Sequence, residues 1–111
     1  LERAAVSALN VSGGDAVRIE LHWRVIAPPG RDLMLFVHLL DADNRIIAQH
    51  DGPLAPVPTA AWQPNDIYSG RAAVLLPSGA PRATYRLFIG VYDPQTGERL
   101  RLEDGRDGIV L

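Results

Sequence analysis

Residues 17–25 read Val-Arg-Ile-Glu-Leu-His-Trp-Arg-Val, and this stretch decides the fold class. Apolar side chains stand at every odd position, while the even positions carry Arg, Glu, His and Arg. A period of two indicates a β-strand with one buried face, because successive side chains of a strand point to opposite faces. A helix would gather Arg18, Leu21 and His22 on one face, which is not an apolar stripe. We therefore expect a strand here, with Trp23 in the core.

The rest of the chain predicts further short strands, separated by turns that are rich in Pro, Gly, Asp and Asn. They are residues 3–9, 33–40, 45–50, 67–76, 84–92, 98–102 and 108–111. No segment has helical periodicity. Seven or eight strands, spaced by roughly ten residues, predict one domain over residues 1–111. The expected fold is all-β: a two-sheet antiparallel sandwich of the immunoglobulin-like or fibronectin type III-like kind.

Two segments resemble domains of this kind. Residues 17–23, followed by Ala-Pro-Pro at 27–29, resemble the second strand of a fibronectin type III domain, whose Trp fills the core. Leu-Pro at 76–77 and Ala-Thr-Tyr-Arg-Leu at 83–87 resemble the approach to the sixth strand, where a tyrosine corner often lies. The resemblance implies that the Tyr85 hydroxyl bonds back to the backbone of the preceding loop.

A second resemblance covers nearly the whole chain. The segments that carry it are 21–24 (Leu-His-Trp-Arg), 36–41 (Phe-Val-His-Leu-Leu-Asp), 48–53 (Ala-Gln-His-Asp-Gly-Pro), 90–93 (Gly-Val-Tyr-Asp) and 96–100 (Thr-Gly-Glu-Arg-Leu). They are similar to soluble β-sandwich domains of bacterial multi-spanning membrane proteins, many of them family 39-like glycosyltransferases that use lipid-linked sugars. The resemblance implies an extracytoplasmic accessory domain, attached to the cell membrane through its parent protein. It implies no transferase activity here, because that family's catalytic acids lie in its membrane-embedded part.

The composition argues against several classes of protein. The chain has 111 residues, a net charge of −2 and eleven basic residues, all of them Arg. These arginines are spread from Arg3 to Arg106 with acids nearby, so the sequence shows no basic stripe for a nucleic acid. No apolar run approaches the roughly 20 residues that span a bilayer, so we expect no membrane insertion by this chain. Because the chain begins with Leu1 rather than Met, we expect a piece of a longer membrane-associated protein.

No cofactor or metal site is predicted. The chain has no Cys, and its three His residues lack a spacing that would bring them to one ion. Asp41, Asp43, Asn44 and Asp51 could offer oxygens to calcium, but they match no EF-hand loop. Asp and Asn are also ordinary turn residues, because their side chains accept hydrogen bonds from nearby backbone N–H groups. We prefer the turn interpretation, and a calcium ion at the Asp41/Asp43 turn stays an open alternative.

Trp62 lies in the proline-rich stretch 51–66, the longest irregular part of the chain. We prefer the interpretation that it covers one end of the sandwich. The alternative is an exposed platform for a sugar ring, with His50 and Asp51 beside it, because an aromatic face suits the C–H surface of a pyranose.

An aromatic patch is expected on the outer face of one sheet. If the odd positions of residues 33–40 face the core, the even positions face outward, and residues 84–92 follow the same rule. The residues thereby placed on neighbouring strands are Phe36, His38, Phe88 and Tyr92. A contiguous exposed apolar patch usually marks an interface. The alternative is that residues 51–66 fold over this face and hide it, and the sequence does not decide between the two.

Three functions follow from these observations. The first is a non-catalytic, extracytoplasmic accessory or interaction domain of a larger envelope protein. It would dock another domain of that protein, or a second copy of itself, through the aromatic patch. The second is a carbohydrate-binding module that uses Trp62, His50 and Asp51. The third and least favoured is a hydrolase, which requires a pocket where an acid and a His meet within hydrogen-bond reach. The serines lie in no nucleophile elbow, so we expect no enzyme.

Overall fold

The computed structural model describes residue 1, residues 3–101 and residues 104–111, and this part of the chain is all-β. Its strands are β1 (Arg3–Val6), β2 (Asn10–Val11), β3 (Ala16–Arg24), β4 (Met34–Leu40), β5 (Ile46–Pro53), β6 (Ile67–Leu75), β7 (Ala83–Thr84), β8 (Arg86–Tyr92) and β9 (Ile109–Val110). A single 3-10 turn, η1 (Thr59–Ala61), lies in the long connection between β5 and β6. None of the described residues forms a helix that is long and apolar enough to cross a membrane.

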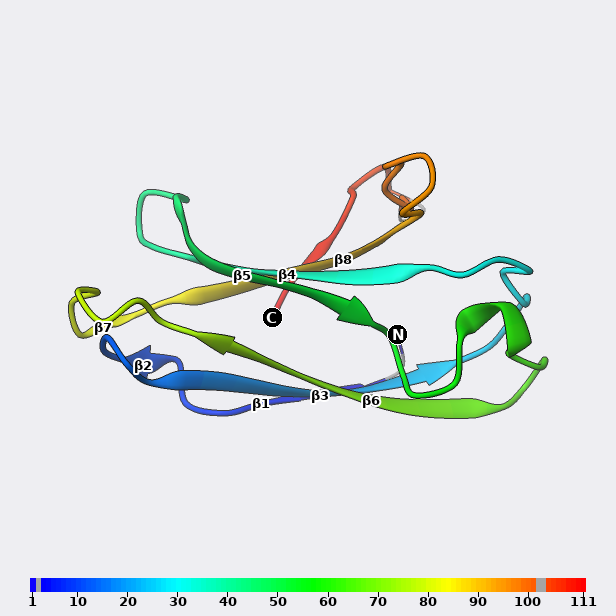
Figure 1. Ribbon diagram of the computed structural model, residues 1–111, viewed down its shortest axis with the longest axis horizontal. Helices are drawn as coiled ribbons and strands as arrows, with labels where there is room; N and C mark the ends of the chain where they lie inside the picture. The colour runs from blue at the N-terminus through cyan, green and yellow to red at the C-terminus, as the bar shows by residue number, and fades with distance from the viewer. Residues whose placement is uncertain (2, 102–103) are drawn as a thin grey trace.

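The strands form antiparallel sheets that lie in two layers (Figure 1). One layer is the three-stranded sheet β1-β3-β6, and the other is the four-stranded sheet β5-β4-β8-β9. The short strands β2 and β7 pair separately. The all-β, antiparallel character that the period of two predicts is confirmed, and the two layers are consistent with a β-sandwich.

The core lies between the two layers and follows the alternation of the strands. Val17, Ile19 and Leu21 of β3 point inward and are at most 2% exposed. Trp23 joins them, and its indole N–H donates a hydrogen bond of 3.2 Å to the Leu54 carbonyl. The expectation that the odd residues of this stretch build the core is confirmed, because burying one face of each sheet removes the largest apolar area from water.

The approach to β8 has the expected corner. Tyr85 is buried, and its hydroxyl donates to the Pro81 carbonyl, 2.5 Å away. The bond returns to the loop before the strand, as the resemblance implied, and it satisfies a polar group that would otherwise be buried without a partner.

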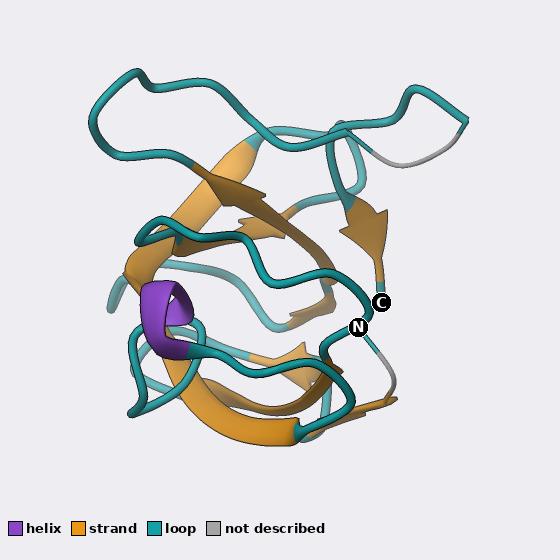
Figure 2. Cartoon of the chain, turned by 90° about the vertical axis from the view of Figure 1, so that its right-hand side faces the viewer, coloured by secondary structure: helices purple, strands orange, loops and turns teal. Residues whose placement is uncertain are grey.

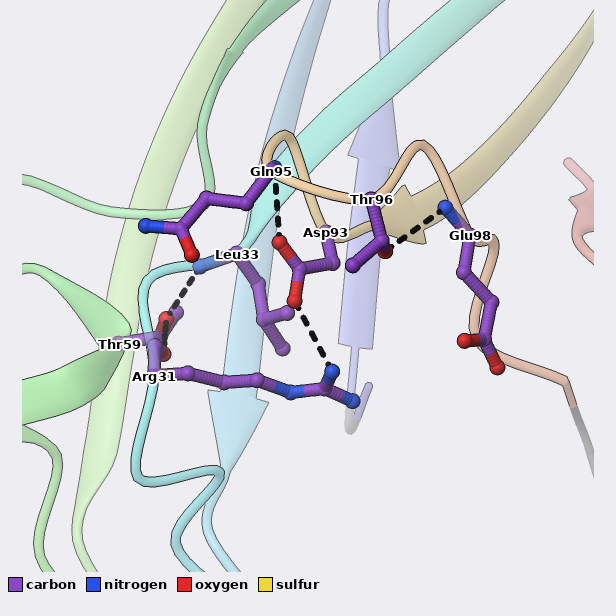
Figure 3. A network of polar contacts seen from close by, with 7 residues as sticks. All are labelled: Arg31, Leu33, Thr59, Asp93, Gln95, Thr96 and Glu98. Atoms are coloured by element: carbon purple, nitrogen blue, oxygen red, sulfur yellow. Dashed lines mark hydrogen bonds and ion pairs between the residues drawn. The ribbon is translucent and has the colours of Figure 1, made fainter.

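The end of the sandwich that carries η1 faces the viewer in Figure 2, and a polar network closes it (Figure 3). Thr59 accepts a hydrogen bond from the Leu33 N–H at 2.8 Å and donates one to the Arg31 carbonyl at 2.7 Å. The Arg31 guanidinium lies 3.0 Å from the Asp93 carboxylate, whose other oxygen accepts from the Gln95 N–H at 2.9 Å. Because these bonds satisfy both Thr59 and Asp93, which are buried, the network serves the fold.

Some predicted boundaries are wrong. β5 continues to Pro53, and residues 59–61 form a helical turn where none was expected. The predicted strand 98–102 is reduced to one bridge between Tyr92 and Arg99, and residue 102 lies outside the described residues. The pairing is limited because the Leu100 N–H donates to the Val91 carbonyl at 2.8 Å, whereas β9 occupies the same edge of β8 at Phe88 and Ile89.

Candidate binding surface

Four rings come together on the outer face of the four-stranded sheet, and we call Phe36, His38, Phe88 and Tyr92 the aromatic cluster. The centre of the Phe36 ring lies 4.8 Å from that of His38, 5.7 Å from Phe88 and 6.5 Å from Tyr92. The register accounts for this, because β4 pairs with β8 and places His38 directly opposite Phe88. The predicted neighbourhood of these two strands is therefore confirmed.

The protein's own chain covers the centre of the aromatic cluster. Phe36 is only 3% exposed, and the Arg99 guanidinium lies 4.5 Å from the centre of its ring. A Cβ atom built on Gly90 would come within 2.2 Å of the Phe36 ring and 2.7 Å of the Asp107 carbonyl. The expectation that Phe36 is exposed is wrong, and so is the alternative cover by residues 51–66. The cover is the C-terminal segment, which we define as Arg99 and residues 107–108.

An ion pair joins the two parts of the C-terminal segment, and a hydrogen bond joins two strands of the sheet beside it. Arg99 pairs with Asp107 at 2.9 Å, and this hydrogen bond lowers the pKa of that carboxyl. Burial, and next the charge of Arg99, lower the pKa of His38 from its ordinary value of 6.5. The Tyr92 hydroxyl donates to Asp51 at 2.7 Å, and this bond raises the pKa of Tyr92. The aromatic cluster is thus a second, smaller packed region outside the sandwich, with His38, Phe88 and Tyr92 half-buried.

Trp62 is buried and does not form a surface platform. Its ring stacks on Tyr68, with centroids 4.7 Å apart and planes 4° apart, and lies 6.4 Å from the Trp23 ring. Its Nε1–H donates to the Val57 carbonyl at 2.9 Å. The interpretation of Trp62 as the cover of one end is confirmed. The exposed sugar platform is wrong, because both the ring and its N–H are already engaged inside the protein.

His50 and Asp51 do not meet Trp62 in one site. The two are consecutive on β5, so their side chains point to opposite faces of the sheet. Asp51 holds Tyr92 on the outer face, whereas His50 borders a hollow beside β6. The three residues proposed for a sugar therefore lie in three different surroundings.

Asp41, one of the carboxylates considered for calcium, makes local bonds. One Asp41 oxygen accepts the N–H groups of Asp43 and Arg45, each at 2.9 Å, which is the turn geometry that was preferred. Within the described residues, no group of three or more His, Asp or Glu side chains is placed to hold a metal ion.

The outer face of the three-stranded sheet is a different surface, which we call the arginine face. The side chains that point outward from β1, β3 and β6 are Arg3, Ala5, Ala16, Arg18, Glu20, His22, Arg24, Ile67, Ser69, Arg71, Ala73 and Leu75. Four of these are Arg and one is acidic, although the whole chain has a net charge of −2. Positive charge is therefore concentrated on one side of the molecule.

Hydrogen bonds order the centre of the arginine face. His22 Nδ1 lies 3.0 Å from Ser69 Oγ, and His22 Nε2 lies 3.1 Å from a Glu20 carboxylate oxygen. Arg3 approaches the same His22 nitrogen at 3.5 Å, and Arg71 lies 3.8 Å from the other Glu20 oxygen. Glu20 thus holds several neighbours in place and offsets only part of the positive charge.

The row Glu20–His22–Ser69 brings an acid and a His together, as the hydrolase hypothesis requires. An acyl-transfer site also needs free donors aimed at the developing oxyanion. β3 is the central strand of its sheet, so its backbone N–H groups are used by β1 on one side and β6 on the other. The contacts of this row order the centre of the arginine face.

Two adjoining hollows lie along the arginine face. The larger has a volume of about 760 Å³, and Arg18 and the small side chain of Ala73 line it. The smaller, of about 550 Å³, lies between β6 and the connection that follows β5. Glu20 and Arg71 line both, so charged groups stand where the two hollows meet.

Exposed aliphatic side chains stand at the two ends of the arginine face. Ile67 lies opposite Arg24 on β6 and is 52% exposed, and Ile26, which follows the end of β3, is 88% exposed. Leu75, 68% exposed, stands at the other end of β6. The face therefore combines positive charge with aliphatic side chains that nothing in the described chain buries.

Sequence reasoning missed this surface. The charged even positions of residues 17–25 were recognised as solvent-facing, but nothing in the sequence joined them to Arg3 or Arg71. The register does so, because it places Arg3 opposite His22 and Arg71 opposite Glu20. A usable signal was present in the outward positions of residues 67–76, which alternate with buried ones and include Arg71.

Comparisons of the chain with protein-family models, with curated protein sequences and with solved structures found no match.

Proposed function

We propose that this chain is a non-catalytic accessory domain of a larger envelope protein, and that it binds a partner through the arginine face. It works outside the cytoplasm, held at the cell membrane by the rest of that protein. The strand order β1-β3-β6 against β5-β4-β8-β9, with Trp23 in the core and Tyr85 at the corner, supports a fibronectin type III-like arrangement.

One observation carries the proposal: among the described side chains of β1, β3 and β6, four arginines and one acid share the outer face of the sheet, in a chain with an excess of acids. Like charges gathered on one face repel one another, so the fold itself gains nothing from them. An anionic partner would convert this repulsion into attraction and would be drawn toward the face during encounter. The aromatic cluster, first considered for docking, is less suited because the C-terminal segment covers Phe36.

Retention on a carboxylated cation-exchange resin at neutral pH and low salt tests this proposal. A chain of net charge −2 should flow through unless its positive charges are concentrated on one face. We expect retention, and we expect Arg18→Glu combined with Arg71→Glu to abolish it. The matched control is Arg45→Glu combined with Arg106→Glu, which changes the net charge equally at exposed positions away from the arginine face. Equal loss of retention in the two double variants would contradict the proposal.

A further inference from the structure

We propose that the arginine face docks onto a surface of anionic phospholipid headgroups. The inference rests on the proposed function and names its partner. The contact is peripheral: the sheet lies on the membrane surface and no segment of the chain spans the bilayer.

The charges fit a surface of phosphate groups. The four arginines come from three adjacent strands, so they are spread over the sheet in two dimensions. A guanidinium presents a planar set of donors that matches the oxygens of a phosphate. A planar array of headgroups can engage charges spread in this way at the same time, whereas a single small anion reaches only those beside it.

The hollows provide room for headgroups between the charged side chains. Arg18 and Arg71 stand at the larger hollow of about 760 Å³, and the small Ala5 and Ala73 leave its floor open. Its neighbour of about 550 Å³ is bounded by Arg71 and Ser69. A phosphate that enters either hollow meets a guanidinium.

The aliphatic side chains distinguish a lipid surface from an acidic glycan. Ile67 and Leu75 are 52% and 68% exposed on the arginine face, and Ile26, which follows β3 in the chain, is 88% exposed. A hydrophilic polysaccharide gains little from such groups. A bilayer surface accepts both kinds of contact, because charges meet headgroups while aliphatic tips reach the acyl boundary below them. Ile26 has the largest exposed fraction of the three and lies just beyond the end of β3.

The experiment compares vesicles of phosphatidylcholine alone with vesicles that contain phosphatidylcholine and phosphatidylglycerol in equal parts. We expect the chain to co-sediment with the anionic vesicles only, and high salt to release it. Arg18→Glu combined with Arg71→Glu should weaken this binding at least about tenfold. Arg45→Glu combined with Arg106→Glu should bind as the parent chain does. The circular dichroism spectrum and the unfolding midpoint establish that each variant is folded.

The variant Ile26→Ser tests the lipid inference separately from the proposed function. It should weaken binding to anionic vesicles several-fold and leave retention on the carboxylated resin unchanged, because only the lipid contact uses the aliphatic side chain. Retention that depends on Arg18 and Arg71, without binding to anionic vesicles, would overturn the lipid inference and leave the proposed function standing. Binding to soluble polygalacturonate in place of vesicles would also overturn it, with an acidic glycan as the occupant. If neither the resin nor the vesicles distinguish the two double variants, both proposals fall.

Discussion

The two outer faces of this sandwich differ in what covers them. On the four-stranded sheet, the outward side chains of β4 and β8 are aromatic, and the chain folds its own C-terminal segment over them. On the three-stranded sheet, the outward side chains include four arginines, and the described residues leave these arginines exposed. The difference teaches that the molecule buries an apolar outer face itself and leaves a charged one in contact with water.

The free energy of removing each face from water explains why one face is covered and the other is not. Covering Phe36 removes an aromatic ring from water, which offsets the conformational entropy lost by ordering the C-terminal segment. Covering the arginine face would remove four guanidinium groups from water, which carries a large desolvation cost. The arginine face therefore stays in contact with water.

The largest expected effect comes from comparing one side-chain truncation on each of the two outer faces. Phe36→Ala should lower the free energy of unfolding by about 3–4 kcal/mol, because Phe36 is the buried centre of the aromatic cluster. Leu75→Ala, on the open arginine face, should change it by less than about 0.5 kcal/mol. Urea unfolding followed by tryptophan fluorescence measures both. Comparable losses in the two variants would show that the arginine face is covered after all.

A smaller effect is expected from replacing Gly90, because the C-terminal segment and Phe36 leave no room for a side chain there. A methyl group at Gly90 would lie 2.2 Å from the Phe36 ring and 2.7 Å from the Asp107 carbonyl, so either the ring or the segment must move. Gly90→Ala should therefore destabilise the protein by about 2 kcal/mol and loosen the C-terminal segment. Gly79→Ala is the control, since a methyl group there meets nothing within 4 Å and its φ is not positive. Hydrogen exchange should accelerate in residues 107–108 of the first variant only.

The smallest expected effect is a pH dependence of the free energy of unfolding that comes from His38 in the aromatic cluster. Because the folded pKa of His38 lies below its ordinary value of 6.5, the unfolded chain binds more protons in the window between the two values. The free energy of unfolding should therefore fall as pH drops below 6.5 and level off below the folded pKa. Unfolding midpoints recorded across this window should show the slope, and His38→Gln should remove its share. A slope that survives unchanged in that variant would assign the effect to other groups.

Much of the fold was readable from local patterns, because inward and outward positions alternate with a period of two. Residues 17–25 and 84–92 predicted which side chains enter the core, and Trp23 and Tyr85 lie there. The irregular stretch 51–66 gave two interpretations of Trp62, since a single ring among prolines carries no period. Trp62 is buried through contacts with Trp23, which is distant in sequence, and with Tyr68, which lies on β6.

Neither the aromatic cluster nor the arginine face could be predicted in full from the sequence, and the physical reason is the same for both. The aromatic cluster was predicted as a set, but its cover comes from Arg99 and residues 107–108, which follow β8 in the chain, and this packing leaves no local mark in the sequence. The arginine face escaped notice because Arg3, Arg18 and Arg71 become neighbours only through the pairing of β1, β3 and β6.

By itself, the sequence determined which side of each strand is apolar, and with it the all-β class and the content of the core. That information is local, because it depends only on the alternation of side chains along an extended backbone. Tertiary structure alone decided which strands are neighbours, in which register they pair, and where the C-terminal segment lies. Those choices depend on contacts between distant residues, and they turned scattered arginines into one face and an expected open aromatic patch into a covered one.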